Sequence, residues 1–477
     1  MKNQYITPNE TMRENDSASI QAAVDLARRV GVNRVVIPRL NQRTGAEKWI
    51  ISETVKLPSD MTVVLADCFM QMADDVVGGF FKSENLFTPD GTDPAKKMRN
   101  IHIIGEGRAI LDGGNPTELN EETQKKIGIP VRLNTPIFLM NVEGFSVENI
   151  EILHQRYWGM RFQFCSYGVI KNIHFDICRD RRNQDGINLR NGCHHITIDN
   201  VSGQTGDDMI ALSAIDRAAA PPFENYDLIV KGEPWDIHDV EIRNVSGAAV
   251  LHPLITMRNH NGAKIYNINI ENVRDTEQTQ PAYEEGNKPL HEGEVYTLGR
   301  RFALILLGHN AYGATPAVMG DTYNIKMKNL HVTYSDSVVL THSVIRDCEV
   351  SDVYASGKCK SILTVMGNEW GDDTLGVKME NFTLSDVDFD CERADSAIID
   401  YRYMREGDYV KGLSLSGVKA KNVPLLAKVH KRCLEFDITL DDGCDCPREI
   451  ETTEPKEVKQ SEITYLPFKA NIERKYN

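Results

Sequence analysis

Apolar and polar residues alternate over short stretches along most of the chain. Ile196 and Ile198, for example, alternate with Thr197 and Asp199. A period of two, rich in β-branched residues and closed by Asn or Gly, is typical of β-strands that end in tight turns. The pattern therefore predicts an all-β protein.

One short pattern recurs at the ends of these stretches: an apolar residue, any residue, Asn, and a second apolar residue. Its Asn residues are Asn100, Asn149, Asn172, Asn200, Asn244, Asn272, Asn329 and Asn381, and looser copies place Asp347 and Gly417 there. Spacings of 23 (172−149), 28 (200−172) and 28 (272−244) residues are those of one solenoid coil. The longer gaps of 44 (244−200) and 57 (329−272) fit coils that carry inserted loops.

Asn suits such a bend because it tolerates the left-handed backbone region and can bond neighbouring backbone groups. We therefore predict a right-handed, single-stranded parallel β-helix with these Asn residues near one edge of the stack. An antiparallel sandwich is the alternative.

The beginning of the chain predicts a different element. Ile20, Ala23, Val24 and Ala27 have helical spacing after the candidate N-caps at 16–17. A short helix here would cover the open end of the solenoid. We expect a cap helix and first coils in 1–60, the β-helix in 61–445, and a charged C-terminal tail in 446–477 that serves as a lid, a partner contact or a loose end.

Composition and charge limit the partners. The 477 residues are 41% hydrophobic, with a net charge of −15 and a pI near 5.4. A polyanion would be repelled, so we expect no nucleic-acid or membrane partner. The ten cysteines lack the paired spacing of a zinc site and are expected to be reduced and mostly buried. No signal peptide is visible, which predicts a cytoplasmic protein, or a secreted one if a leader has been trimmed.

The densest polar segments carry the candidate chemistry. Asp185 is followed 22 residues later (207−185) by Asp207 and Asp208. This is about one coil, and neighbouring strands lie about 4.8 Å apart. Carboxylates that close cannot all stay ionised without cost, so one is expected to hold a proton, as a general acid must. Solvated turns and calcium binding are the competing interpretations of the same residues.

These residues resemble a known family. Asn183-Gln184-Asp185 resembles the Asn-Thr-Asp motif of the family-28 glycoside hydrolases, the polygalacturonases and their relatives, and the run 206–212 resembles their Asp-Asp segment. The opening, from Ser19-Ile20-Gln21-Ala22-Ala23 through Val35-Val36-Ile37-Pro38 to Leu57, also looks like that family's start. The resemblance covers about 16–273 and implies a parallel β-helix that hydrolyses pectic or related plant cell-wall sugars.

The resemblance also implies roles. Asp207 would protonate the leaving oxygen, while Asp185 and Asp208 would activate water in an inverting hydrolysis, whose acid and base stand roughly 6.5 to 9.5 Å apart. His252 is the candidate for the imidazole that the family places beside the acid, although the glycines that flank it there are missing here. No cofactor or metal is implied.

Candidate substrate-binding residues are Asn183, Arg182, Trp158 and Arg258. Trp158 would stack on a sugar or be buried in the core. The family's Arg-x-Lys motif, which grips the sugar carboxylate, is missing near Arg301, so we expect specificity to shift away from polygalacturonate. A polysaccharide lyase on the same fold and a non-catalytic carbohydrate-binding β-helix are the alternative functions. The sequence leaves the oligomeric state open.

Overall fold

The computed structural model describes most of the chain. The described residues are 4–115, 119, 126–177, 183–215, 228–249, 252–277, 303–308, 315–366, 376–391, 393–402, 407–430, 433, 435–453 and 470–475. They form two compact units. The first contains the described residues of 4–211 and 228–241, and the second contains 212–215 and the described residues from 242 onward.

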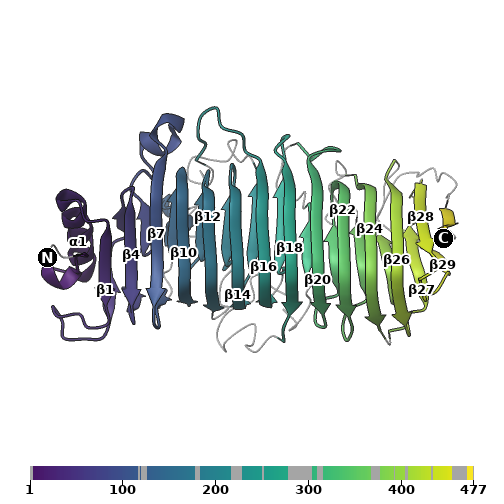
Figure 1. The fold of residues 1–477 in the computed structure, drawn as a ribbon, viewed down its shortest axis with the longest axis horizontal. Helices are drawn as coiled ribbons and strands as arrows, with labels where there is room; N and C mark the ends of the chain where they lie inside the picture. The colour runs from purple at the N-terminus through teal and green to yellow at the C-terminus, as the bar shows by residue number, and fades with distance from the viewer. Residues whose placement is uncertain are drawn as a thin grey trace. The chain divides into compact units, whose positions relative to one another are not determined.

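A helix begins the first unit, as the sequence predicts. The helix α1 (Asp16–Val30) is capped by Asn15, whose side chain accepts a hydrogen bond from the Ala18 N–H, so the cap lies one residue before the expected pair. Its buried face contains the four predicted apolar residues. Figure 1 shows α1 beside β1 (Arg34–Pro38) at the N-terminal end of this unit. Short 3-10 helices lie at Pro8–Glu10, Pro89–Thr92, Pro94–Lys96 and Val131–Asn134.

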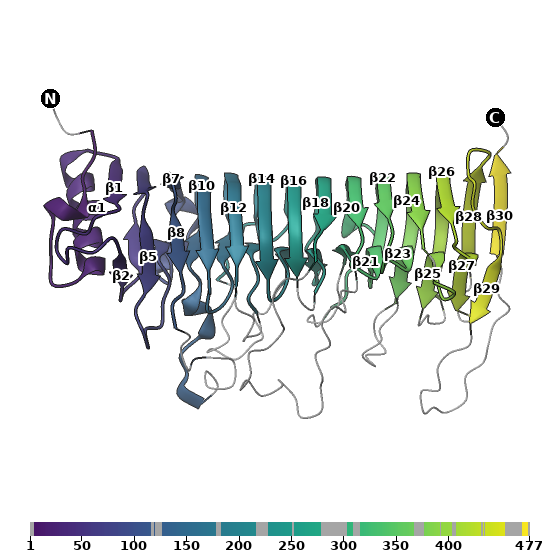
Figure 2. The ribbon, with the colours of Figure 1, turned by 90° about the horizontal axis from the view of Figure 1, so that it is seen from below.

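Parallel strands build the rest of the first unit. One set contains β1, β4 (Met61–Ala66), β7 (Met98–Glu106), β10 (Val142–Leu153), β12 (Ser166–Asp176) and β14 (His194–Thr205). A second sheet contains β3 (Val55–Leu57), β6 (Phe81–Ser83), β9 (Ile137–Met140), β11 (Met160–Gln163) and β13 (Ile187–Arg190). The short strands β2 (Trp49–Ile51), β5 (Phe69–Met72) and β8 (Ile110–Asp112) also pair in parallel, and Figure 2 shows β5 next to β8.

The second unit repeats this arrangement. One set contains β18 (Ile265–Asp275), β20 (Thr322–Val332), β22 (Val344–Ala355), β24 (Lys378–Asp390), β26 (Tyr409–Lys421), β28 (Glu435–Asp441) and β30 (Ala470–Lys475). The other contains β17 (Ile255–Asn259), β19 (Ile305–Leu307), β21 (Ser337–Thr341), β23 (Ser361–Met366), β25 (Ala397–Arg402), β27 (Leu425–His430) and β29 (Ile450–Thr453). Two further strands, β15 (Ile210–Ala214) and β16 (Ile237–Ala249), contribute residues to both units.

This topology is that of a right-handed parallel β-helix. Consecutive strands of each sheet pair in parallel, which rules out the antiparallel sandwich. The expected tail is partly built into the coils, because β29 pairs with β27 and β30 pairs with β28. The boundaries predicted at 60 and 445 remain expectations. Among the described residues, no helix has the length and apolar character to cross a membrane.

Several of the predicted Asn residues stack near one edge of the coils, and their side chains bond one another in ladders. In the first unit Asn172 Nδ2 donates to Asn149 Oδ1 at 2.6 Å, and Asn200 Nδ2 donates to Asn172 Oδ1 at 2.8 Å. In the second unit Asn272 Nδ2 donates to Asn244 Oδ1 at 2.6 Å. All five residues have φ between 55° and 60°, the left-handed conformation that Asn tolerates.

The prediction that Asn100 lies at the same edge as Asn149 was wrong, because each coil has two corners and Asn100 lies at the other one. Residues 99 and 101 pair with residues 143 and 145, so Asn100 lies beside Gly144, five residues before Asn149 (149−144). We call the column through Asn100, Gly144, Tyr167 and His195 the first corner column, and the column through Asn149, Asn172 and Asn200 the second corner column. Asn381 also belongs to a first-corner position, since its Nδ2 donates to Asp347 Oδ1 at 2.9 Å.

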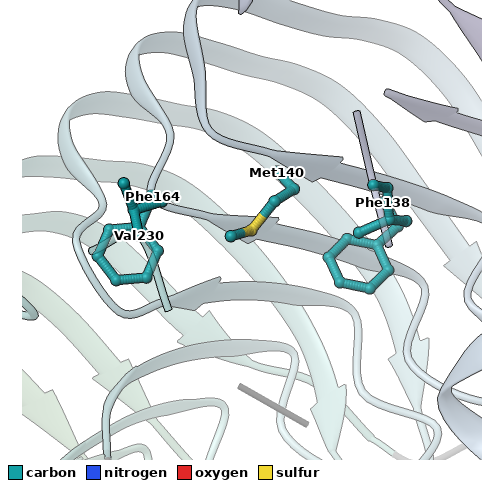
Figure 3. Close-up of a cluster of buried hydrophobic side chains, with 5 residues drawn as sticks. Phe138, Met140, Phe164 and Val230 are labelled. Atoms are coloured by element: carbon teal, nitrogen blue, oxygen red, sulfur yellow. The ribbon is translucent and has the colours of Figure 1, made fainter. Parts of the chain in front are cut away.

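Apolar side chains fill the interior, and one further cluster lies outside it. Phe145 and Phe162 stack inside the first unit with ring centroids 4.7 Å apart. A separate cluster packs Phe138, Met140 and Phe164 against Val230 (Figure 3). Gln163 Nε2 also donates to the Leu228 carbonyl oxygen at 2.5 Å. The segment 228–235 therefore covers part of the second sheet of this unit.

The cysteines of the described residues are free thiols, as expected. Eight of the nine are buried, and Cys446 is half-buried. Burial raises the pKa of the Cys193 thiol to about 12. These groups therefore act as small apolar side chains.

Candidate active site

Asp185 and Asp208 occupy matching positions on neighbouring coils of the first unit. The Gly159 N–H donates to the Asp185 carbonyl oxygen at 2.8 Å, and the Gly186 N–H donates to the Asp208 carbonyl oxygen at 2.9 Å. The repeated bond shows that Asp208 stacks on Asp185 at the spacing of parallel strands, about 4.8 Å. The structure thus brings together the acids that the sequence grouped, while their catalytic roles remain a prediction.

Asp207 differs from its two neighbours in exposure. Asp208 is fully buried and Asp185 is 4% exposed, whereas Asp207 is half-buried. The Asp208 N–H donates to Asp207 Oδ1 at 2.9 Å, and the Thr205 hydroxyl donates to the Asp207 carbonyl oxygen at 2.7 Å. Asp207 is therefore held in place and is the most accessible of the three carboxylates.

Gly186 permits this close stacking. A Cβ atom at residue 186 would lie 2.4 Å from the Met209 carbonyl oxygen on the next coil. Real Cβ atoms do not approach a carbonyl oxygen that closely, and the backbone of a packed coil cannot move away freely. The glycine thus sets the distance between the coils that carry Asp185 and Asp208.

Trp158 lies one coil before Asp185 and is largely buried. It is 8% exposed and stacks on Tyr157, with ring centroids 5.1 Å apart. The guanidinium carbons of Arg161 and Arg190 lie 5.2 and 5.4 Å from its ring centroid. Trp158 was expected either to stack on a sugar or to be buried, and the structure shows that most of its surface is buried.

The remaining candidates lie in different parts of the chain. Asn183 is half-buried, with a left-handed φ of 60°, two residues before Asp185. His252 is half-buried and Arg258 is 7% exposed on β17, and both belong to the second unit. Arg182 and Arg301 lie outside the described residues.

The comparison with known proteins agrees with this geometry. The model of the glycosyl hydrolases family 28 matches residues 91–219, which include all three aspartates. Residues 91–219 of the chain are therefore similar to the glycosyl hydrolases of family 28. The fold of the chain is similar to that of the family 28 exopolygalacturonase of Yersinia enterocolitica, with 13% identity, coverage of 96% of this chain and 79% of that chain, and a TM-score of 0.51.

A phage protein shares the same fold. The tailspike protein of E. coli bacteriophage HK620, solved in complex with a pentasaccharide, is 11% identical, with coverage of 95% of this chain and 78% of that chain and a TM-score of 0.52. No curated protein matches the sequence.

The first unit also has buried polar residues that the sequence analysis did not single out. Arg161 and Arg190 lie on β11 and β13 at 0% and 4% exposure. Residues 161 and 163 pair in register with 188 and 190, so these positions form polar rows on the outer face of the second sheet. The sequence feature that could have revealed them is the alternation Met160-Arg161-Phe162-Gln163. The same alternation is expected for any strand with one solvated face, so it does not identify a buried arginine.

A half-open cavity of about 120 Å³ continues this outer face toward the N-terminus. Its lining includes Lys82, Phe87 and Phe138. Lys82 pairs in register with Phe138, and Phe138 pairs with Arg161, so the cavity begins one coil from the buried arginine. Burial, followed by the charge of Lys56, lowers the pKa of Lys82. Aromatic rings and a cation are suitable contacts for a sugar chain.

The close contact at Gly186 leads to a prediction about stability and turnover. We expect Gly186→Ala to lower both Tm and kcat, because overpacking of this kind costs about 1 to 3 kcal/mol and any relief must shift the coil that carries Asp208. Gly443→Ala is the matched control, since its Cβ atom would meet no atom closer than 3.4 Å. Thermal melts and initial rates on both variants test this, and equal behaviour of the two would contradict it.

Proposed function

We propose that the chain hydrolyses a glycosidic bond in a pectic or related plant cell-wall oligo- or polysaccharide, with inversion at the anomeric carbon. Asp207 is the general acid, and Asp185 and Asp208 together activate the water. The observation that carries the proposal is the register of Asp185 and Asp208 on neighbouring coils, with the more exposed Asp207 beside them.

The proposed reaction assigns one step to each group. Asp207 gives its proton to the glycosidic oxygen as the bond from that oxygen to the anomeric carbon breaks. The paired carboxylates accept a proton from water as the water oxygen bonds the same carbon from the opposite side. The product therefore has the inverted anomeric configuration, and proton exchange with solvent resets both acids.

The pectic substrate class rests on the family resemblance and on the Yersinia enzyme, which is an exopolygalacturonase. The tailspike protein was solved in complex with a pentasaccharide, which supports an oligosaccharide as the ligand of this fold. The outer face beside Trp158 and the cavity near Lys82 offer further contacts along the same unit.

The decisive experiment follows both the bond and the anomer. Pectic and neutral oligosaccharides are incubated with the chain, and the products are analysed for reducing ends, for ultraviolet absorption and for anomeric configuration by proton NMR. New reducing ends of inverted configuration without ultraviolet absorption are expected. An absorbing, unsaturated product would instead identify a lyase, and binding without any product would identify a non-catalytic β-helix.

We also expect homogalacturonan to be cleaved more slowly than the best neutral or mixed pectic substrate. The Arg-x-Lys motif is missing near Arg301, and the fully buried Arg161 already donates a hydrogen bond to Gln163 Oε1 at 2.7 Å. A uronate beside three aspartates in a chain of net charge −15 would be repelled. Turnover on homogalacturonan above that on every neutral or mixed substrate would refute this expectation.

A further inference from the structure

Three histidines and an aspartate gather on the surface of the first unit, at the starts of β14 and β16. They are His194 and His195 on one coil and His238 and Asp239 on the next. The side chains of His195, His238 and Asp239 are 44%, 23% and 37% exposed. The cluster lies at the opposite end of β14 from Asp207 and takes no part in the proposed hydrolysis.

The ligand atoms of this cluster are close enough for one metal ion. His238 Nδ1 donates a hydrogen bond to Asp239 Oδ2 at 2.7 Å, which a metal ion would replace, and His195 Nε2 lies 3.7 Å from the same oxygen. One ligand atom from each of the three residues lies within 4.8 Å of the others. Ligands about 2.0 to 2.2 Å from a tetrahedral zinc ion are about 3.3 to 3.5 Å apart, so small side-chain movements would complete the site.

The corners of the fold account for Asp239 but do not by themselves call for a histidine at residue 195. His195 and Asp239 have φ of 54° and 53°, and both occupy first-corner positions. In the second unit, comparable corners hold Asn267 and Asn324, which form a ladder with an Nδ2–Oδ1 distance of 2.6 Å. The same strand β14 keeps Asn200 at its second corner. Asn and Asp therefore satisfy the corner elsewhere, whereas the corner at 195 holds a histidine, next to the Asp at 239.

Neighbouring rings hold the imidazoles in place. His194 Nδ1 and His195 Nδ1 are 2.8 Å apart, so one ring donates a hydrogen bond to the other. With His195 as the donor, its Nε2 keeps the lone pair that faces Asp239, which is the tautomer that a metal ligand needs. The His194 and His238 rings stack 4.9 Å apart, and Tyr167 lies 4.9 Å from the His195 ring.

We propose that His195, His238 and Asp239 bind one divalent transition-metal ion of the zinc class. Two imidazole nitrogens and one carboxylate oxygen suit such an ion, whereas calcium and magnesium prefer oxygen ligands. The partial exposure leaves room for water to complete the coordination. The ion would join two consecutive coils and stabilise the folded chain, because it binds the assembled ligands and not the dispersed ones.

The test is zinc binding to the tag-free full-length chain after treatment with a chelator. Competition with a chromophoric chelator should give about one zinc ion per chain. His195→Asn and Asp239→Asn both keep a residue that tolerates the corner conformation, and each should weaken binding by at least about 10-fold. His174→Asn is the control, since this exposed histidine lies on β12 and contacts Ser202 at 2.9 Å. It should change the affinity less than twofold.

Two results would overturn the proposal. One is the absence of stoichiometric zinc binding, and the other is binding that neither corner variant weakens. X-ray absorption of the zinc-loaded wild-type chain tests the site without any variant, because imidazole ligands give a characteristic scattering pattern. A spectrum with oxygen ligands alone would reject the site. We further expect zinc to raise the Tm of the wild-type chain and of the His174→Asn control, and not that of the corner variants.

Discussion

Replacing Asp207 by Asn is expected to lower kcat by about 10² to 10⁴, the usual contribution of a general acid, while KM changes little. The amide keeps the shape of the side chain and can still accept the hydrogen bond from the Asp208 N–H, which is 2.9 Å long. It cannot give a proton to the leaving oxygen. Because Asp207 is half-buried, the substitution should disturb the fold little.

The measurement is the initial rate over a range of substrate concentrations, with circular dichroism to check folding. Asp25→Asn, which removes an exposed carboxylate from α1, is the matched control and should retain full activity. A folded Asp207→Asn chain that keeps more than about a tenth of the wild-type kcat would show that another group is the acid.

The sequence predicted the coils because their signals are local. Each strand alternates apolar and polar residues, and each second corner requires a residue that tolerates positive φ and bonds its neighbours. Asn149, Asn172 and Asn200 meet both needs and form the ladder that their spacing implied. The helix α1 could be predicted in the same way, since the apolar residues of its buried face recur with the period of an α-helix.

Strand pairing was the information that the pattern lacked. The same four-residue pattern surrounds Asn100 and Asn149, yet the two residues occupy different corners of their coils. Only the register, which pairs Arg99 with Glu143 and Ile103 with Val147, separates them. A local pattern cannot supply that register, because both corners place the same demands on the backbone.

The candidate site could be predicted only in part, because a local pattern does not show which distant segments pack together. The stacking of Asp185 and Asp208 follows from a spacing of about one coil, so the sequence could group them. Burial of Arg161 and Arg190 depends on what covers the sheet, and the segment 228–235 packs there from a distant part of the chain. The cluster of His195 and Asp239 could have been found from the repeat, because each lies five residues before a corner Asn, Asn200 or Asn244 (200−195, 244−239).

The second large effect is expected from substitutions of the paired carboxylates, Asp185 and Asp208. Asp185→Asn and Asp208→Asn are each expected to lower kcat by about 10²-fold or more, because each removes half of the group that takes the proton from water. The two residues lie in register on neighbouring coils and share one task, so their effects should not multiply. The double variant should lose only slightly more than the worse single variant.

Asp199→Asn is the matched control for burial. Asp199 is 8% exposed on β14, and its carboxylate lies 3.9 Å from the Lys171 ammonium. Its loss should cost stability and leave kcat within about twofold of wild type, which is the expectation for a residue outside the reaction. If the losses at Asp185 and Asp208 instead multiply, to about 10⁴ from two effects of about 10², the two carboxylates act in separate steps. The water would then have a single base, and the in-register pair would need another explanation.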